Sequence, residues 1–358
     1  MKIGVPKEVK PLEERVALIP DAVGHLVERG HDLFVQLSAG GASGYSDELY
    51  REAGAEIVPD ADALYQSAQL IVKVKEPIDS EFDRLEERHR LFSYLHLAAN
   101  PELCDVLLDK GLVAVAFETV EVRGQLPLLA PMSDIAGRLS VQIGATLLHR
   151  YHGGRGLLLG GLAAAERGSV VVLGAGSAGG KAAATAAALG AEVTVFARAR
   201  ASLEKMRQLG NNVTALYAFK DSLVKAVQNA DLLVGAVLVP GAKAPQLIDE
   251  NLVSAMKPGS VIVDIAVDQG GCIETTHPTD YTAPTYVSQG VVHFAVTNMP
   301  AAVPRSASQA LSAALIPYVT RLAEDDWQQD EALQRGINVA HGKMVNSAVA
   351  EALNLKTN

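Results

Sequence analysis

The chain has 358 residues, a length that favours two domains over a single core. Its 31 basic and 41 acidic side chains give a net charge of −10, which disfavours binding to nucleic acid or to an anionic membrane. Its two cysteines cannot form a disulfide framework, so we expect a reducing compartment. Residues 1–6 enter an apolar strand without a secretory leader, and the longest apolar runs are about half the roughly 20 residues that span a bilayer. We therefore expect a soluble, cytoplasmic protein.

Short apolar runs alternate with helical patterns over most of the chain, which is typical of parallel sheets covered by helices. In the first third we expect a helix over residues 21–30 and strands near residues 2–5, 33–36, 70–74, 91–94 and 113–117. In the middle third we expect strands near residues 170–173, 192–196, 232–236, 261–265 and 292–295. A glycine-rich surface loop at 153–161 lies between these blocks, and after Pro304 the pattern is helical to the end. The sequence therefore predicts an α/β fold with two doubly wound parallel-sheet (Rossmann-like) domains, each with a ligand edge at the carboxyl ends of its strands.

The strongest local motif is a glycine-rich turn at residues 174–179, GAGSAG, directly after the apolar run 170–173. It opens an alanine-rich helix over residues 181–189, and a second strand follows, which is the context that a dinucleotide-binding fingerprint requires. Gly174 permits the tight turn, Gly176 lets a pyrophosphate approach the backbone, and Gly179 lets the helix pack on the strand. The alternative is a glycine-rich turn that binds no ligand.

One part of this fingerprint is missing. An acidic residue is expected at the end of the second strand to bind the ribose hydroxyls, but the chain has Ala197 there, followed by Arg198 and Arg200. An arginine near this position can pair with the 2′-phosphate of NADP. The choice between NAD and NADP therefore stays open.

Several passages together resemble the alanine dehydrogenase and pyridine nucleotide transhydrogenase family. They are GVPKE at residues 4–8, ERV at 14–16, VKVKEP at 72–77, YLHLAA at 94–99, GAVLVPG at 235–241 and DIAVDQGGC at 264–272. The resemblance covers essentially the whole chain. The length favours the alanine dehydrogenase branch, because the transhydrogenase subunit usually continues into further, often membrane-spanning, segments.

The resemblance implies reversible oxidative deamination of L-alanine to pyruvate and ammonia, with hydride transfer to a nicotinamide cofactor. Arg15 would pair with the substrate carboxylate, Lys75 would stabilise charge on the carboxylate or carbonyl oxygen, and His96 would act as acid and base. Asp268 would orient or deprotonate the attacking amine or water. Taken alone, Arg15 and Lys75 could be solvated charges, His96 a structural histidine and Asp268 a turn former. Asp264, by contrast, is expected to be structural.

Further residues are assigned by the same resemblance. Met132 and Asn298 would contact substrate. The cofactor-binding set is Ser133, Gly174, Gly176, Ser177, Ala178, Gly179, Ala197, Arg198, Val237, Leu238, Val239, Val267, Asp268, Asn298 and Met299. No His/Cys cluster has metal-ligand spacing. Small molecules are the expected partners, together with copies of the chain in a hexamer.

The family's architecture would place residues 1–128 and 306–358 in a substrate domain and residues 129–305 in a dinucleotide-binding domain, with a cleft between them. Two other functions remain open. One is a related amino-acid dehydrogenase or a transhydrogenase-like nucleotide-binding protein. The other is a nucleotide sensor without chemistry, against which the joint presence of Arg15, Lys75, His96 and Asp268 argues.

Overall fold

A computed structural model of the chain describes residues 1–237 and 245–355. The chain forms two compact units, one of residues 1–132 and 303–358 and the other of residues 133–302. The expected domain boundaries at 128/129 and 305/306 lie a few residues from these divisions. Within the described ranges, no helix combines the length and apolarity needed to cross a membrane.

The first unit is built on a mostly parallel sheet with the strand order β15-β14-β6-β5-β4-β1-β2-β3. Its parallel strands are β1 (Lys2–Val5), β2 (Asp32–Gln36), β3 (Glu56–Val58), β4 (Leu70–Val72), β5 (Arg90–Ser93) and β6 (Val113–Ala116). The chain runs outward from β1 to β3, returns to β4 beside β1, and then continues to β6. This is a doubly wound order, and its switch point lies between β1 and β4.

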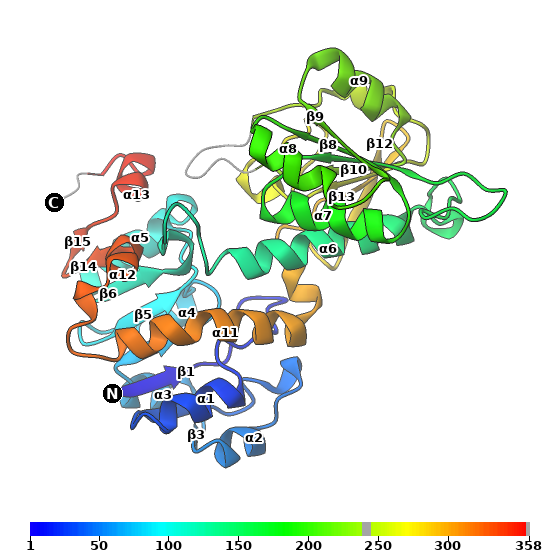
Figure 1. The fold of residues 1–358 in the computed structure, drawn as a ribbon. Coiled ribbons are helices and arrows are strands. Elements are labelled where there is room, and N and C mark those ends of the chain that lie inside the picture. Colours follow the sequence, from blue (N-terminus) through cyan, green and yellow to red (C-terminus); the bar gives the residue numbers. More distant parts are fainter. Residues whose placement is uncertain (238–244, 356–358) are drawn as a thin grey trace. The chain divides into compact units, whose positions relative to one another are not determined.

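Helices cover this sheet and connect its strands (Figure 1). They are α1 (Pro20–Val27), α2 (Asp47–Glu52), α3 (Ala61–Ser67), α4 (Asp79–Phe82), α5 (Pro101–Lys110), α11 (Pro304–Leu322), α12 (Glu331–Gly336) and α13 (Ser347–Ala352). Local sequence sets several of their ends. Asp60 caps α3 by accepting from the Ala63 N–H, and Gly111 ends α5 in the left-handed region with φ of +70°.

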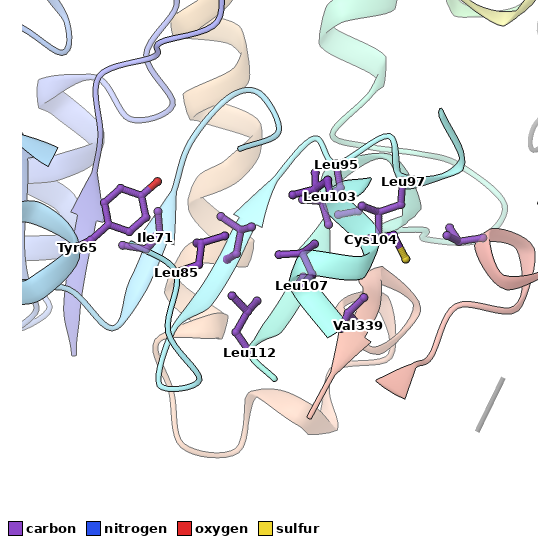
Figure 2. Packing of buried hydrophobic residues seen from close by; sticks show 14 of the residues in the cluster. Tyr65, Ile71, Leu85, Leu95, Leu97, Leu103, Cys104, Leu107, Leu112 and Val339 are labelled. Atoms are coloured by element: carbon purple, nitrogen blue, oxygen red, sulfur yellow. The ribbon is translucent and has the colours of Figure 1, made fainter. Parts of the chain in front are cut away.

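A continuous apolar core lies on one side of the strands β4, β5 and β6 (Figure 2). Ile71, Leu91 and Ala114 supply its sheet face, and Leu103 and Leu107 of α5 pack onto them. These five side chains are at most 3% exposed. The core therefore holds the parallel strands in place, and with them the loops at their carboxyl ends.

The second unit repeats the doubly wound order. Its sheet runs β12-β13-β11-β10-β7-β8-β9, and its parallel strands are β7 (Ser169–Leu173), β8 (Glu192–Ala197), β9 (Val213–Tyr217), β10 (Leu232–Gly235), β11 (Val261–Asp264) and β13 (Val291–Phe294). The switch point lies between β7 and β10. The helices of this unit are α7 (Ser177–Ala188), α8 (Arg200–Arg207), α9 (Lys220–Asn229) and α10 (Glu250–Ser254), while α6 (Ala130–Leu147) crosses from the first unit into the second.

The predicted α/β class is confirmed, and each predicted strand is present within about two residues of its expected bounds. The expectation of helix to the end after Pro304 is wrong. A hairpin of β14 (Ile337–Ala340) and β15 (Lys343–Met344) extends the first sheet antiparallel to β6. Its turn contains His341 and Gly342, both at positive φ, as a tight two-residue hairpin requires.

Three further short strands were not predicted: β3, β9 and β12 (Thr285–Ser288). Each is an outermost strand of its sheet, and most of its residues are exposed or half-buried. Edge strands of this kind carry little of the apolar patterning that marks a buried strand.

Candidate active site

The pairing of β1 with β4 brings two functional loops to one edge of the first sheet. Ile3 lies opposite Leu70 and Gly4 opposite Ile71, in parallel register. The segments after these strands, residues 6–15 and 73–75, therefore leave the sheet side by side at its carboxyl edge. Arg15 and Lys75 lie on these segments.

Arg15 is held by a neighbour in sequence. Its side chain is 2% exposed, and its Nε and Nη2 donate to the two carboxylate oxygens of Glu13 at 2.7 and 2.5 Å. Burial by itself lowers the pKa of Arg15, but the hydrogen bond and charge of Glu13 outweigh this effect and raise it. Nη1 donates to the Met132 sulfur at 3.0 Å, so Met132 lies at the Arg15 head group.

The Glu13 contact determines how Arg15 can meet a ligand. The Glu13 carboxylate occupies the Nε–Nη2 edge of Arg15, so a ligand carboxylate cannot bind along that edge. Glu13 was not identified from the sequence. The available signal was its position two residues before Arg15 in a loop at a sheet edge.

Lys75 lies in a mixed-charge group. Its Nζ is 3.4 Å from a Glu76 oxygen, and the other Glu76 oxygen accepts from Lys10. The Lys75 side chain is 13% exposed; burial lowers its pKa, and the Glu76 carboxylate offsets only part of that effect. The positive charge of Arg15 also lowers the pKa of Lys75.

His96 follows β5 in an unusual backbone conformation. Its φ is +47°, in the left-handed region, which a non-glycine residue seldom adopts without support. Glu118 supplies that support by accepting from the backbone N–H groups of Leu95 and His96, the latter at 2.6 Å. The half-buried imidazole stacks with the Tyr94 ring, with 5.8 Å between ring centroids and 10° between planes. Tyr94 is buried, and its hydroxyl donates to the Leu128 carbonyl.

The glycine turn of the second unit has the geometry that its motif predicts. Gly174 has φ of +101°, and a Cβ there would lie 2.4 Å from the Ala236 carbonyl oxygen. A Cβ on Gly179 would lie 2.0 Å from the Gly174 carbonyl oxygen. At Gly176, directly before α7, an added Cβ meets nothing within 4 Å. The backbone N–H groups of the first turn of α7, including Ser177 and Ala178, therefore begin beside open space, as a phosphate site requires.

Helix α6 lies close against this turn. A Cβ on Gly137 of α6 would lie 2.1 Å from the Ala178 carbonyl oxygen, and Asp134 pairs with Lys181 of α7 at 3.3 Å. Ser133, half-buried in the first turn of α6, belongs to the same segment.

The loop after β11 is closed by a buried carboxylate. Asp264 accepts from the backbone N–H groups of Ala266 and Cys272 and from the Thr276 hydroxyl. Burial raises the pKa of Asp264, although these hydrogen bonds oppose the change. Its place in the structure fits the structural role expected for it. Between Ala266 and Cys272, Val267 is buried and Asp268 is exposed.

The remaining cofactor candidates lie at other strand ends of the second unit. Ala197 ends β8 half-buried, and Arg198 after it is exposed. Val237 follows β10, whereas Leu238 and Val239 lie outside the described residues. Asn298 is half-buried, and the carbonyl of the buried Met299 accepts from the Tyr281 hydroxyl. The described candidates that follow strands thus fall into two groups, one at the carboxyl edge of each sheet. Among the residues that it describes, no His, Cys, Asp and Glu cluster suits a metal ion.

Comparisons with known proteins agree with this arrangement. Residues 4–136 match the family model "Alanine dehydrogenase/PNT, N-terminal domain", and residues 140–347 match "Alanine dehydrogenase/PNT, C-terminal domain". An alanine dehydrogenase of Mycolicibacterium smegmatis is 46% identical over 361 residues, which cover 99% of this chain and 97% of that protein. The chain belongs to the alanine dehydrogenase/PNT family.

Solved structures of the family support the same conclusion. An L-alanine dehydrogenase structure is 49% identical with a TM-score of 0.96, covering 99% of each chain. A transhydrogenase from Sinorhizobium meliloti shares the fold at a TM-score of 0.85 but is 26% identical, over 97% of this chain and all of that one. The predictions of the family, and of an amino-acid dehydrogenase of the alanine dehydrogenase type, are confirmed. The family implies a nicotinamide cofactor, and the open space at Gly176 fits its pyrophosphate.

The glycine geometry separates a binding effect from a folding effect. We expect Gly176→Val to weaken NADH affinity and leave the melting temperature nearly unchanged, because the new side chain would occupy the pyrophosphate path and its Cβ would meet no protein atom within 4 Å. Gly179→Val is the matched control and should lower the melting temperature, since its Cβ meets backbone. Fluorescence titration with NADH and thermal unfolding measure both. Unaltered NADH affinity in a normally folded Gly176→Val protein would place the nucleotide site elsewhere.

Proposed function

We propose that the chain catalyses the reversible oxidative deamination of L-alanine to pyruvate and ammonia, with the first unit as substrate domain and the second as dinucleotide-binding domain. The observation that carries this proposal is that Arg15, Lys75 and His96 lie at the carboxyl edge of the first sheet. In the second unit, the glycine turn after β7 is open at Gly176. The group combines a fixed guanidinium, a cation of lowered pKa and an imidazole. An enzyme needs such groups to bind the carboxylate of a 2-oxo acid, to stabilise charge on its carbonyl oxygen and to transfer a proton.

Each side chain has a distinct role in the proposed reaction. Arg15, fixed by Glu13, binds the substrate carboxylate through its guanidinium group, and Met132 lies beside that group. Lys75 donates to the carbonyl oxygen and stabilises the negative charge that develops there. His96 gives a proton to that oxygen or to the carbinolamine and removes it in the reverse direction.

Further roles are proposed for residues of the second unit. Asp268 orients or deprotonates the attacking amine or water, and Asn298 contacts substrate. The nicotinamide, when bound, supplies or accepts the hydride, and the protein orients it toward Cα. The proposed cofactor contacts are Ser133, Gly174, Gly176, Ser177, Ala178, Gly179, Ala197, Arg198, Val237, Leu238, Val239, Val267, Asp268, Asn298 and Met299. We further propose, from the family resemblance, a cytoplasmic hexamer.

Steady-state assays that follow the near-ultraviolet absorbance of NADH test the proposal. Assays of ammonium with pyruvate, glyoxylate or 2-oxoglutarate compare the substrates, and pyruvate should give the highest kcat/KM.

His96→Ala should lower kcat by about 10²–10⁴-fold, the loss expected for a positioned proton-transfer group, without weakening NADH binding. His149→Ala, an exposed histidine, is the matched control and should retain activity. Near-wild-type kcat in His96→Ala would exclude the proposed role of His96.

The end of β8 generates a proposal on cofactor choice. Ala197 provides no carboxylate to bind the ribose hydroxyls or repel a 2′-phosphate, and Arg198 stands next to it with an exposed side chain. Arg200 is 91% exposed and pairs with Glu204 on its own helix at 2.8 Å, so Arg198 is the better candidate for a phosphate. We therefore propose that the protein uses NADPH as well as NADH.

Ala197→Asp should shift the preference toward NADH by about 1.5–3 kcal/mol, the contribution of a hydrogen bond to a charged group. Ala201→Asp adds the same charge at an exposed position on α8 and should shift it less. The ratio of kcat/KM for NADH to that for NADPH, measured in the three proteins, checks this expectation. A parent protein already about a hundredfold better with NADH would contradict the proposal.

A further inference from the structure

A buried ionic cluster lies directly behind the proposed substrate site. Lys73 is 1% exposed, and its Nζ donates to both carboxylate oxygens of Glu81 at 2.7 and 2.6 Å. The Tyr65 hydroxyl donates to the same carboxylate at 3.0 Å. A second buried carboxylate, that of Glu8, lies 3.9 Å from the Lys73 ammonium. None of these side chains belongs to the candidate site.

The cluster contains two carboxylates and one ammonium, so it is short of one positive charge when both acids ionise. Glu81 makes the close contacts with Lys73 and also accepts from the Ile78 N–H, and it is therefore the better stabilised anion. Glu8 lies farther from the Lys73 ammonium, at 3.9 Å, and its hydrogen bonds come from neutral backbone N–H groups. Burial raises the pKa of Glu8 to about 7, because Lys73 offsets only part of the cost of removing the carboxylate from water.

Glu8 also joins the two loops that carry the proposed substrate-binding cations. It lies on the segment after β1, and its carboxylate accepts from the backbone N–H groups of Val74 at 2.6 Å and Lys75 at 3.3 Å. Those groups belong to the segment after β4. The position of the Lys75 backbone therefore depends on the Glu8 carboxylate.

We propose that Glu8 is a positioning residue whose ionisation holds Lys75 in place and makes productive pyruvate binding depend on pH, an inference that rests on the proposed function. An ionised Glu8 is a strong acceptor for both N–H groups. A protonated Glu8 has one hydroxyl oxygen, which is a poorer acceptor, so its hydrogen bonds to the backbone N–H groups of Val74 and Lys75 weaken. Other charged or titratable groups that act on Glu8 or are influenced by it are Lys73, Glu13, Glu81, Arg15 and Tyr65.

Stability should change with pH in the opposite direction to activity. Because the pKa of Glu8 is raised in the folded protein, folding takes up a proton between its ordinary value of 4.5 and about 7. The stabilisation by neutral Glu8 is complete below that window and is lost as the pH rises through about 7. Glu8→Gln is neutral at every pH. Relative to this variant, the wild type should therefore become less stable, yet more active, as the pH rises.

The test compares the wild type with Glu8→Gln from about pH 6 to about pH 9, a range centred near the titration of Glu8. The wild-type to variant ratio of kcat/KM for pyruvate should rise about tenfold across this range, as expected for weakened hydrogen bonds to a charged acceptor. The KM for NADH should not follow it. Glu52→Gln, which removes an exposed carboxylate on α2, is the control and should give a flat ratio near one. Urea unfolding of the same proteins from about pH 4.5 to about pH 8 measures the stability difference across the window in which it should change.

A flat ratio for Glu8→Gln, in a wild type that converts pyruvate, would overturn the inference and leave the proposed function intact. A wild type without pyruvate turnover would instead refute the proposed function. If Glu8→Gln does not fold, Glu8→Asp serves in its place, because the shorter side chain keeps the charge but cannot reach both N–H groups. A raised pyruvate KM in Glu8→Asp at alkaline pH supports the inference, and a wild-type KM there overturns it.

Discussion

The parallel pairing of β1 with β4 is the constraint on which the candidate substrate site depends. These strands are buried neighbours at the point where the strand order reverses, so the loops that follow them diverge from one edge. The layer beneath β1 packs closely against it, since a Cβ on Gly4 would lie 2.7 Å from the Ala68 side chain. Arg15 and Lys75 are distant in sequence, and this pairing brings them close.

Buried acids then determine what these cations can do. Glu13 holds the Nε–Nη2 edge of Arg15, while Glu8 accepts hydrogen bonds from the backbone N–H groups of Val74 and Lys75. A buried charge is costly unless it is paired, so each acid stabilises its neighbour while restricting its orientation. The second unit achieves its geometry by steric means, through glycines packed against the carbonyl groups of Ala236 and Gly174.

The sequence was a good guide to buried parallel strands and to the glycine turn, because both depend on local pattern. It was a poor guide to the edge strand β9 and to the hairpin after α12, whose short strands carry weak apolar patterning. The strand ends predicted from the sequence were enough to place Arg15, Lys75 and His96 at the carboxyl edge of the first sheet. Their partners Glu13, Glu8 and Glu118 could not be deduced in this way, since each contact depends on how the loops fold back on the sheet.

The proposed function depends above all on substrate binding through Arg15 at the carboxyl edge of the first sheet. The most direct test is the KM for pyruvate and for NADH in Arg15→Lys, with thermal unfolding to confirm a folded protein. Lysine keeps the charge but loses the planar pair of donors, so the account predicts a large rise in the pyruvate KM and little change for NADH. An unchanged pyruvate KM in the folded variant would contradict the claim.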